Sequence, residues 1–196
     1  MRAANDARED ALPGPEPARR GDWMQTYTGR AFWPLDPKRE DLDIVDIAHA
    51  LSLQCRFNGH CRGFYSVADH SLRVAAMLTG EARLFGLLHD AGEAYIGDIV
   101  RPLKGLAPRL KQAEEEILAL IFQRFSDRHP TPREWGAVKL ADAVLLATEA
   151  RDLMGPPARE WEELPPPLPD RLFPHGPPET VEQDFLATFA EYGGRP

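Results

Sequence analysis

The stretch LLHDAGEAYIGD, from Leu87 to Asp98, decides how this chain is interpreted. Its apolar residues indicate a buried helix, yet His89, Asp90 and Glu93 stand in the middle of it. His89 and Glu93 are four residues apart, and Asp90 and Glu93 are three apart, so the expected helix carries all three along one side. Because a buried, unpaired carboxylate or imidazole is costly, the stretch predicts partners for these groups inside the core.

Two further ionisable residues lie in apolar helical surroundings. His70 is found in VADHSLRVA, and Asp142 in VKLADAVLLATEA. An internal hydrogen-bond network is one interpretation of such groups. The other is that three helices each direct a metal-type ligand inward, since one shared cation would remove the cost of burying all four groups. Imidazole and carboxylate ligands suit Mn²⁺, Co²⁺, Zn²⁺, Fe²⁺ or Ni²⁺.

Composition narrows the class of protein. The chain has 196 residues, enough for one domain with a substantial hydrophobic core. Its 43% hydrophobic and 28% charged content is typical of a globular protein in water. A net charge of −8 argues against binding long nucleic acids, whose phosphates favour a basic surface. A small anionic substrate is still compatible, because a few arginines in a cleft can override the global charge.

Nothing in the sequence predicts a membrane or secreted protein. No apolar run approaches the roughly 20 residues of a membrane-spanning helix, and the N-terminus lacks the apolar region of a signal peptide. Cys55 and Cys61 are too few for a disulfide framework and do not form a CxxC zinc motif. We therefore expect a cytoplasmic protein with reduced thiols and no membrane contact.

Periodicity and capping signals predict an all-α fold. Residues 1–22 are expected to form a flexible tail, and residues 23–196 a single domain. The Pro-rich segment 155–178 predicts a loop, functional or disordered, before a last helix over 180–192. No convincing strand alternation is found. Three further helices are expected over 43–55, 66–80 and 81–95, a fourth begins after Pro108, and a fifth covers 131–154. Asp43, Ser66 and Thr131 are the expected N-caps.

The ionisable residues also match a known pattern. His70, then His89-Asp90, then Asp142 resemble the H…HD…D signature of the HD-domain metal-dependent phosphohydrolases. The segments HDAGEAYIGDIVRPLK (89–104) and KLADA (139–143) are similar to those of bacterial 5′-deoxynucleotidases and of related phage-type deoxynucleoside triphosphate hydrolases. The similarity covers roughly residues 48–153. It implies a single-domain helical bundle of the HD type.

The resemblance also implies roles for individual residues. Glu93 matches an acidic residue that orients or deprotonates the attacking water, a role that suits a carboxylate beside a metal-bound water. Arg56 matches an arginine that orients the phosphate, and Asp98 opens the segment that contacts the nucleotide. The implied catalytic residues are Glu93, Asp98 and Arg56. The implied ligands of the metal are His70, His89, Asp90 and Asp142.

Two positions depart from the family's pattern. Phe57 stands where the family typically has a tryptophan that packs on the sugar, and Arg101 adds a cation where deoxynucleotidases generally have a neutral side chain. Arg56, Phe57, Asp98 and Arg101 form the expected substrate-binding set. Two-metal members of the superfamily insert additional histidine ligands between the HD pair and the final aspartate. Between Asp90 and Asp142 the only histidine here is His129, which precedes a proline, so the resemblance implies one metal ion rather than two.

The resulting expectation is a metal-dependent phosphohydrolase of the nucleotidase type. Its expected substrate is a 5′-deoxynucleoside monophosphate, from which it releases phosphate. One alternative is a deoxynucleoside triphosphate triphosphohydrolase of the same fold, because Arg101 would suit a longer phosphate chain. A second alternative is a non-catalytic nucleotide-binding sensor, although Glu93 argues for catalysis. The expected partners are a small nucleotide and, by resemblance, further copies of the chain in a dimer or larger homo-oligomer.

Overall fold

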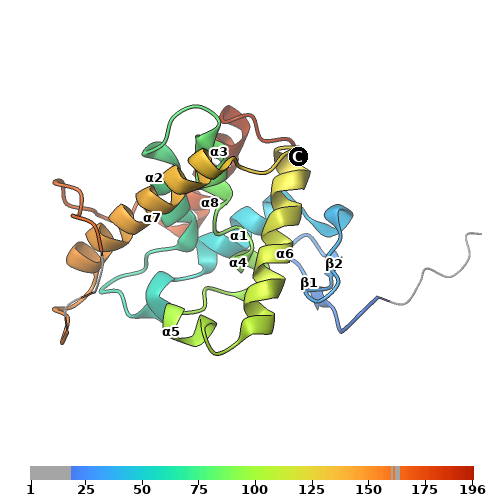
Figure 1. The fold of residues 1–196 in the computed structure, drawn as a ribbon, viewed down its shortest axis with the longest axis horizontal. Helices are drawn as coiled ribbons and strands as arrows, with labels where there is room; N and C mark the ends of the chain where they lie inside the picture. The colour runs from blue at the N-terminus through green and yellow to red at the C-terminus, as the bar shows by residue number, and fades with distance from the viewer. Residues whose placement is uncertain (1–18, 160, 162–163) are drawn as a thin grey trace, which may run out of the picture.

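The computed structural model describes residues 19–159, 161 and 164–196. This part of the chain is mostly helical, with a minor two-stranded hairpin at one side (Figure 1). Within the same residues, no helix has both the length and the apolar character that a membrane crossing requires. The helices are α1 (Ile44–Leu53), α2 (Val67–Ala76), α3 (Ala82–Leu88), α4 (Glu93–Ile96), α5 (Arg101–Lys104), α6 (Pro108–Phe125), α7 (Pro132–Leu153) and α8 (Pro178–Glu191).

Helix α2 occupies the centre of the bundle. It packs against α3, α1, α7 and α8, and α1 in turn packs against α8 and α4 (Figure 1). The core is continuous across these helices and includes Ile47, Leu51, Val74, Leu87 and Phe185, all fully buried. Because α2 is covered on several sides, a polar side chain on its inner face must find its partners inside the protein.

The hairpin corrects the expectation that the chain has no strand. Strands β1 (Met24–Gln25) and β2 (Ala31–Phe32) pair in antiparallel register, and the turn between them is closed by Thr26 N donating to Arg30 O at 2.9 Å. Two residues per strand are too few to show the alternation by which a strand is recognised in sequence. The buried carboxylate of Asp46 on α1 accepts hydrogen bonds from Thr28 N (2.7 Å) and Thr28 Oγ1 (3.0 Å), which ties the hairpin to α1.

Part of the expected tail 1–22 is described. Residues 1–18 lie outside the described residues. Arg19 forms ion pairs with Asp36 (3.2 Å) and Asp41 (2.7 Å), and its guanidinium lies 4.3 Å from the ring centre of Trp33. Among the described residues, contacts with the folded domain are therefore already present at Arg19, before Trp23.

The three predicted N-caps are confirmed. Asp43 Oδ1 accepts from Val45 N at 2.9 Å, and Ser66 Oγ accepts from Asp69 N at 3.1 Å. Thr131 forms a full capping box, with its Oγ1 accepting from Glu134 N (3.3 Å) and Glu134 Oε2 accepting from Thr131 N (2.7 Å). These starts are readable from sequence because both partners lie within four residues of each other.

Glu134 should make the stability of the protein depend on pH. Hydrogen bonds from Arg128 lower the pKa of Glu134 from 4.5 to about 2, with further help from Thr131. A lowered pKa contributes stability above pH 4.5 that is lost as the pH falls towards 2. Glu134→Gln should therefore lower the free energy of unfolding by about 1 kcal/mol at pH 7, and the difference from wild type should shrink below pH 4.5.

Urea unfolding of both proteins at several pH values measures this difference. Glu115→Gln is the control, because Glu115 pairs only loosely with Lys111 (3.7 Å) and both side chains are largely exposed. A pH-independent difference for Glu134→Gln would contradict the predicted linkage.

The expected helix over 81–95 is wrong as a continuous element. Helix α3 ends at Leu88, and α4 starts only at Glu93. His89 Nδ1 lies 2.8 Å from Gly86 O, the carbonyl that would accept the amide of Asp90 in an uninterrupted helix. The turn is instead closed by tighter bonds, from Ala91 N to Leu88 O (3.0 Å) and from Glu93 N to Asp90 O (2.9 Å). The imidazole of His89 thus takes the place of the backbone amide of Asp90 as the hydrogen-bond donor to Gly86 O.

Gly86 permits the close approach of α3 to α2. A Cβ added at Gly86 would lie 2.4 Å from Leu78 Cδ1 and 3.2 Å from Ala75 Cα, whereas one at Gly136 on α7 would meet nothing within 4 Å. We expect Gly86→Ala to destabilise the protein by about 1–2 kcal/mol through overpacking. Gly136→Ala should stabilise it by about 0.5–1 kcal/mol, since alanine favours the helix. Urea unfolding measures the free energy of unfolding of both variants. A change in the same direction in both would contradict the packing argument.

Part of the Pro-rich segment 155–178 is anchored to helices. Its backbone amides at Leu168, Leu172 and His175 donate to side chains of the bundle at 2.7–2.9 Å. The acceptors are Thr148 and Asp152 on α7 and Asp69 on α2. Residues 160 and 162–163 lie outside the described residues. From Leu168 onwards the segment therefore follows the surfaces of α7 and α2.

Candidate metal centre

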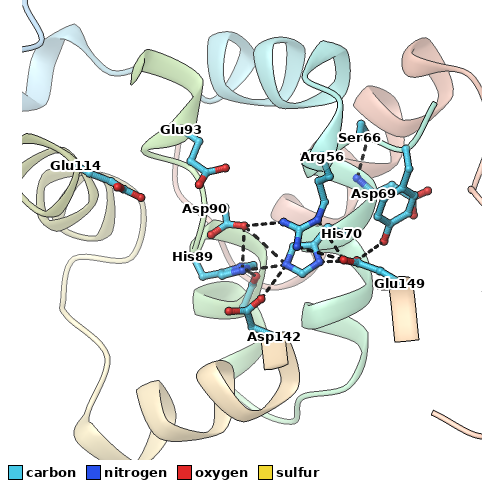
Figure 2. Close-up of polar contacts among 12 residues, drawn as sticks. Arg56, Ser66, Asp69, His70, His89, Asp90, Glu93, Glu114, Asp142 and Glu149 are labelled. Carbon is cyan, nitrogen blue, oxygen red and sulfur yellow. Dashed lines mark hydrogen bonds and ion pairs between the residues drawn. The ribbon is translucent and has the colours of Figure 1, made fainter. Parts of the chain in front are cut away.

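Four side chains from three parts of the chain meet at one place, where the two imidazoles are buried and the two carboxylates are partly buried. His70 comes from α2, His89 and Asp90 from the turn after α3, and Asp142 from α7 (Figure 2). Ligand atoms of His70, His89 and Asp90 all lie within 4.8 Å of one another. Asp142 Oδ1 lies 3.3 Å from His70 Nε2. The structure therefore brings together the four residues that the sequence singled out.

The hydrogen bonds of the two imidazoles decide which nitrogens face the cluster. His89 Nδ1 must carry a proton, because its neighbour, Gly86 O, can only accept. His70 Nδ1 lies 2.7 Å from Glu149 Oε1. Burial alone would raise the pKa of Glu149, but His70 and Arg56 lower it below its usual value, so Glu149 is an ionised acceptor. Both Nε2 atoms are then left with lone pairs directed into the cluster.

These lone pairs fit a bound cation. His70 Nε2 and His89 Nε2 are 3.3 Å apart, and Asp90 Oδ2 lies 3.2 Å from the second and 3.7 Å from the first. Metal–ligand bonds of about 2.0–2.2 Å place neighbouring ligand atoms roughly 3–3.5 Å apart, close to these values. The outer nitrogens also have the partners that metal-binding histidines usually have, a carboxylate and a backbone carbonyl. The residues present could therefore hold a metal ion.

Without a cation, a proton on His70 takes its place. Burial of His70 favours the neutral ring, but the carboxylates of Glu149 and Asp142 outweigh it and raise its pKa to about 9. A metal ion and this proton compete for the same lone pair of His70 Nε2. In either case a positive charge balances the carboxylates around the imidazole.

Glu149 is the site residue that sequence reasoning missed. It is fully buried and accepts from Tyr65 OH at 2.8 Å and from Arg56 Nε at 3.2 Å, in addition to its contact with His70 (Figure 2). Glu149 follows Asp142 by seven residues, or two turns of α7, and so lies on the same face. A second carboxylate at this spacing in an apolar helix was the signal that could have identified it.

Arg56 lies beside the cluster, as expected. Its Nη1 is 3.5 Å from Asp90 Oδ2, while Nε and Nη2 both lie 3.2 Å from Glu149 Oε2. These carboxylates raise its pKa against the effect of burial. A guanidinium has five N–H donors, and these contacts use three of them. Arg56 therefore supports Glu149 and still has donors to offer to an anion.

Glu93 is buried next to the cluster, and only one of its two carboxylate oxygens has a hydrogen-bond partner among the described residues. Its Oε1 accepts from Lys104 Nζ at 3.1 Å, whereas its Oε2 has no hydrogen-bond partner among the described residues. Burial, and then the charges of Asp90 and Asp98, raise the pKa of Glu93 to about 9 against the effect of Lys104. A cation held at Asp90 would oppose this repulsion and favour the ionised carboxylate.

The remaining sequence-predicted residues surround this group. Asp98, in the link from α4 to α5, is partly buried, which raises its pKa, and it lies within the electrostatic influence of Arg56. The Phe57 ring stands 5.4 Å from the guanidinium carbon of Arg56 and 6.3 Å from the ring of Trp161. Phe57 also has a positive φ of 54°, an uncommon conformation for a large side chain. The side chain of Arg101 lies outside the described part of the structure.

Comparison with known proteins gives close relatives. Over 67% of its length the chain is 41% identical to Uncharacterized protein YfdR of Escherichia coli strain K12, and the match covers 72% of that protein. The chain belongs to the YfdR family. It is also 35% identical to Uncharacterized protein RCAP_rcc00048 of Rhodobacter capsulatus, over 68% of this chain and 74% of that protein. No protein-family model matches the chain. The YfdR family relationship names no activity, so the chemistry must be argued from the site.

Proposed function

We propose that the chain is an HD-domain phosphohydrolase that uses one divalent cation to hydrolyse 5′-deoxynucleoside monophosphates. The observation that carries the proposal is the meeting of two imidazole Nε2 atoms and two carboxylates, whose lone pairs can converge on one cation once the outer nitrogens of the imidazoles are satisfied. Beside them is a buried carboxylate with a free oxygen. A metal site with an adjacent proton acceptor is what hydrolysis by an activated water requires. The mostly helical architecture is compatible with the HD type.

The cation would be held by His70, His89, Asp90 and Asp142. It would act as a Lewis acid that polarises a phosphoryl oxygen and lowers the pKa of water. Glu149 and Gly86 O hold the two imidazoles in the tautomer that ligation needs.

Glu93, Arg56 and Asp98 have complementary roles in the proposed reaction. The free Oε2 of Glu93 accepts the proton of the attacking water. Arg56 directs its remaining donors to the phosphate oxygens, where negative charge is greatest. Asp98 is a carboxylate whose pKa is affected by burial and by the charges of Arg56 and Asp90, and it can accept a hydrogen bond from the sugar. These assignments divide the reaction among proton transfer, phosphate binding and sugar binding.

A product assay tests the proposal. The purified chain with Mn²⁺ or Co²⁺ is given dAMP, AMP and dATP separately, and the products are resolved by anion-exchange chromatography. Deoxyadenosine and phosphate from dAMP, with AMP spared, is the expected result. Deoxyadenosine with triphosphate from dATP would support a triphosphohydrolase instead. Binding of a nucleotide without turnover of any of the three would support a sensor.

A further inference from the structure

Lys104 connects the proposed water-activating residue to a distant part of the chain. Its ammonium lies 3.1 Å from Glu93 Oε1 and 2.8 Å from Glu114 Oε1. The three residues belong to α5, α4 and α6, which places one cation between two carboxylates from separate helices. The sequence alone offers no reason to join Lys104 with Glu114, because their contact depends on how α5 turns back onto α6.

The contact determines which oxygen of Glu93 is available. Because the last torsion of a glutamate is broad, an unrestrained carboxylate samples many orientations. Lys104 binds Oε1 and leaves Oε2 without a partner among the described residues. Glu93 is only 3% exposed, so bulk solvent has little access to compete with Lys104 for Oε1. The orientation of the free oxygen is therefore decided by Lys104.

Backbone packing holds Glu114 in place. A Cβ added at Gly92, the residue before Glu93, would lie 3.4 Å from Glu114 O and 3.9 Å from Ile117 Cγ2. The start of α4 therefore rests against α6 at the turn that carries Glu114, with Glu114 on the far side of Glu93 from the metal centre (Figure 2). This close approach lets a single lysine reach both carboxylates.

We propose that Lys104, held by Glu114, is a positioning residue that fixes the carboxylate of Glu93 with Oε2 free for the attacking water. This inference rests on the proposed function, in which Glu93 accepts a proton from that water. Lys104 itself is tied to two carboxylates and is not assigned to the phosphate. Its ammonium has three donors in a compact head, and two of them account for the contacts observed.

The first test is steady-state kinetics of Lys104→Met with dAMP and Mn²⁺. We expect kcat to fall by about tenfold or more, because a general base contributes about 10²–10⁴-fold and depends on its geometry. KM for dAMP and the bound Mn²⁺ should stay within about threefold of wild type, since Lys104 contacts Glu93 and Glu114 and is assigned neither to the phosphate nor to the metal. Lys104→Arg retains the cation and should recover most of kcat. Lys111→Met is the control, because its partner Glu115 is 3.7 Å away and exposed.

The second test needs no activity. Urea unfolding of metal-free Lys104→Met, Glu93→Gln and the double variant forms a double-mutant cycle, and we expect non-additive shifts of the unfolding midpoint. If Lys104→Met does not fold, Glu114→Gln replaces it and should lower kcat with KM unchanged.

The possible failures are distinguishable. Absence of turnover by the wild-type protein on all three nucleotides overturns the proposed function and, with it, this role. Wild-type turnover together with an unchanged kcat in Lys104→Met, or an equal loss in Lys111→Met, overturns the inference alone. Additive midpoint shifts in the cycle also count against it.

Discussion

Asp142→Ala is expected to lose both the bound cation and turnover. The side chain of Asp142 reaches the cluster from α7, with Oδ1 3.3 Å from His70 Nε2, and no other residue of α7 was assigned as a ligand. Loss of an outer partner of a metal ligand typically costs about 10–100-fold in affinity or activity, so loss of a ligand should cost at least about 100-fold. Mass spectrometry of the metal content and the dAMP assay measure the two effects.

Glu134→Gln is the matched control for this prediction. Glu134 lies at the start of the same helix and its carboxylate is occupied by Arg128 and Thr131. It should retain metal and turnover at neutral pH. Full metal content in Asp142→Ala would remove Asp142 from the ligand set, and unchanged turnover would contradict the proposed mechanism.

Glu93→Gln is expected to keep the metal and lose turnover. The amide has nearly the same size as the carboxylate but cannot accept the proton of the attacking water. Because general base catalysis contributes about 10²–10⁴-fold, kcat should fall by that range. KM should change little, since Glu93 is not assigned to phosphate or sugar binding. Glu93→Ala should likewise retain the cation.

Metal content and steady-state kinetics separate this effect from misfolding. Glu115→Gln is the control, because Glu115 is an exposed carboxylate on α6. A fully active Glu93→Ala would remove Glu93 from the mechanism. Loss of the cation in Glu93→Gln would instead assign Glu93 to metal binding.

Local signals made the helix starts predictable. Asp43, Ser66 and Thr131 each bind an amide two or three residues away, and the apolar spacing that follows them is confirmed by α1, α2 and α7. The same reasoning failed over 81–95, where periodicity alone indicated one helix. The bond from His89 to Gly86 O interrupts it, and a side chain that competes for a backbone carbonyl leaves no mark on hydrophobic spacing.

The candidate site was predictable in its ionisable residues but not in its supporting contacts. His70, His89, Asp90 and Asp142 stand out in sequence because each is an ionisable group in an apolar run. Glu149 was missed although it occupies the same face of α7 as Asp142. The contacts of Lys104 with Glu93 and Glu114 could not be inferred, because they depend on the packing of three separate helices.

The sequence by itself determined where α1, α2 and α7 begin and that His70, His89, Asp90 and Asp142 need partners, since both depend on residues within one or two turns. Only the tertiary structure decided how those groups are paired. It aligned both Nε2 atoms by fixing the outer nitrogens of His70 and His89, and within the described part of the chain it left Oε2 of Glu93 without a hydrogen-bond partner. The physical reason is that hydrogen bonds and ion pairs act over about 3 Å, so their partners are set by how helices distant in sequence pack together.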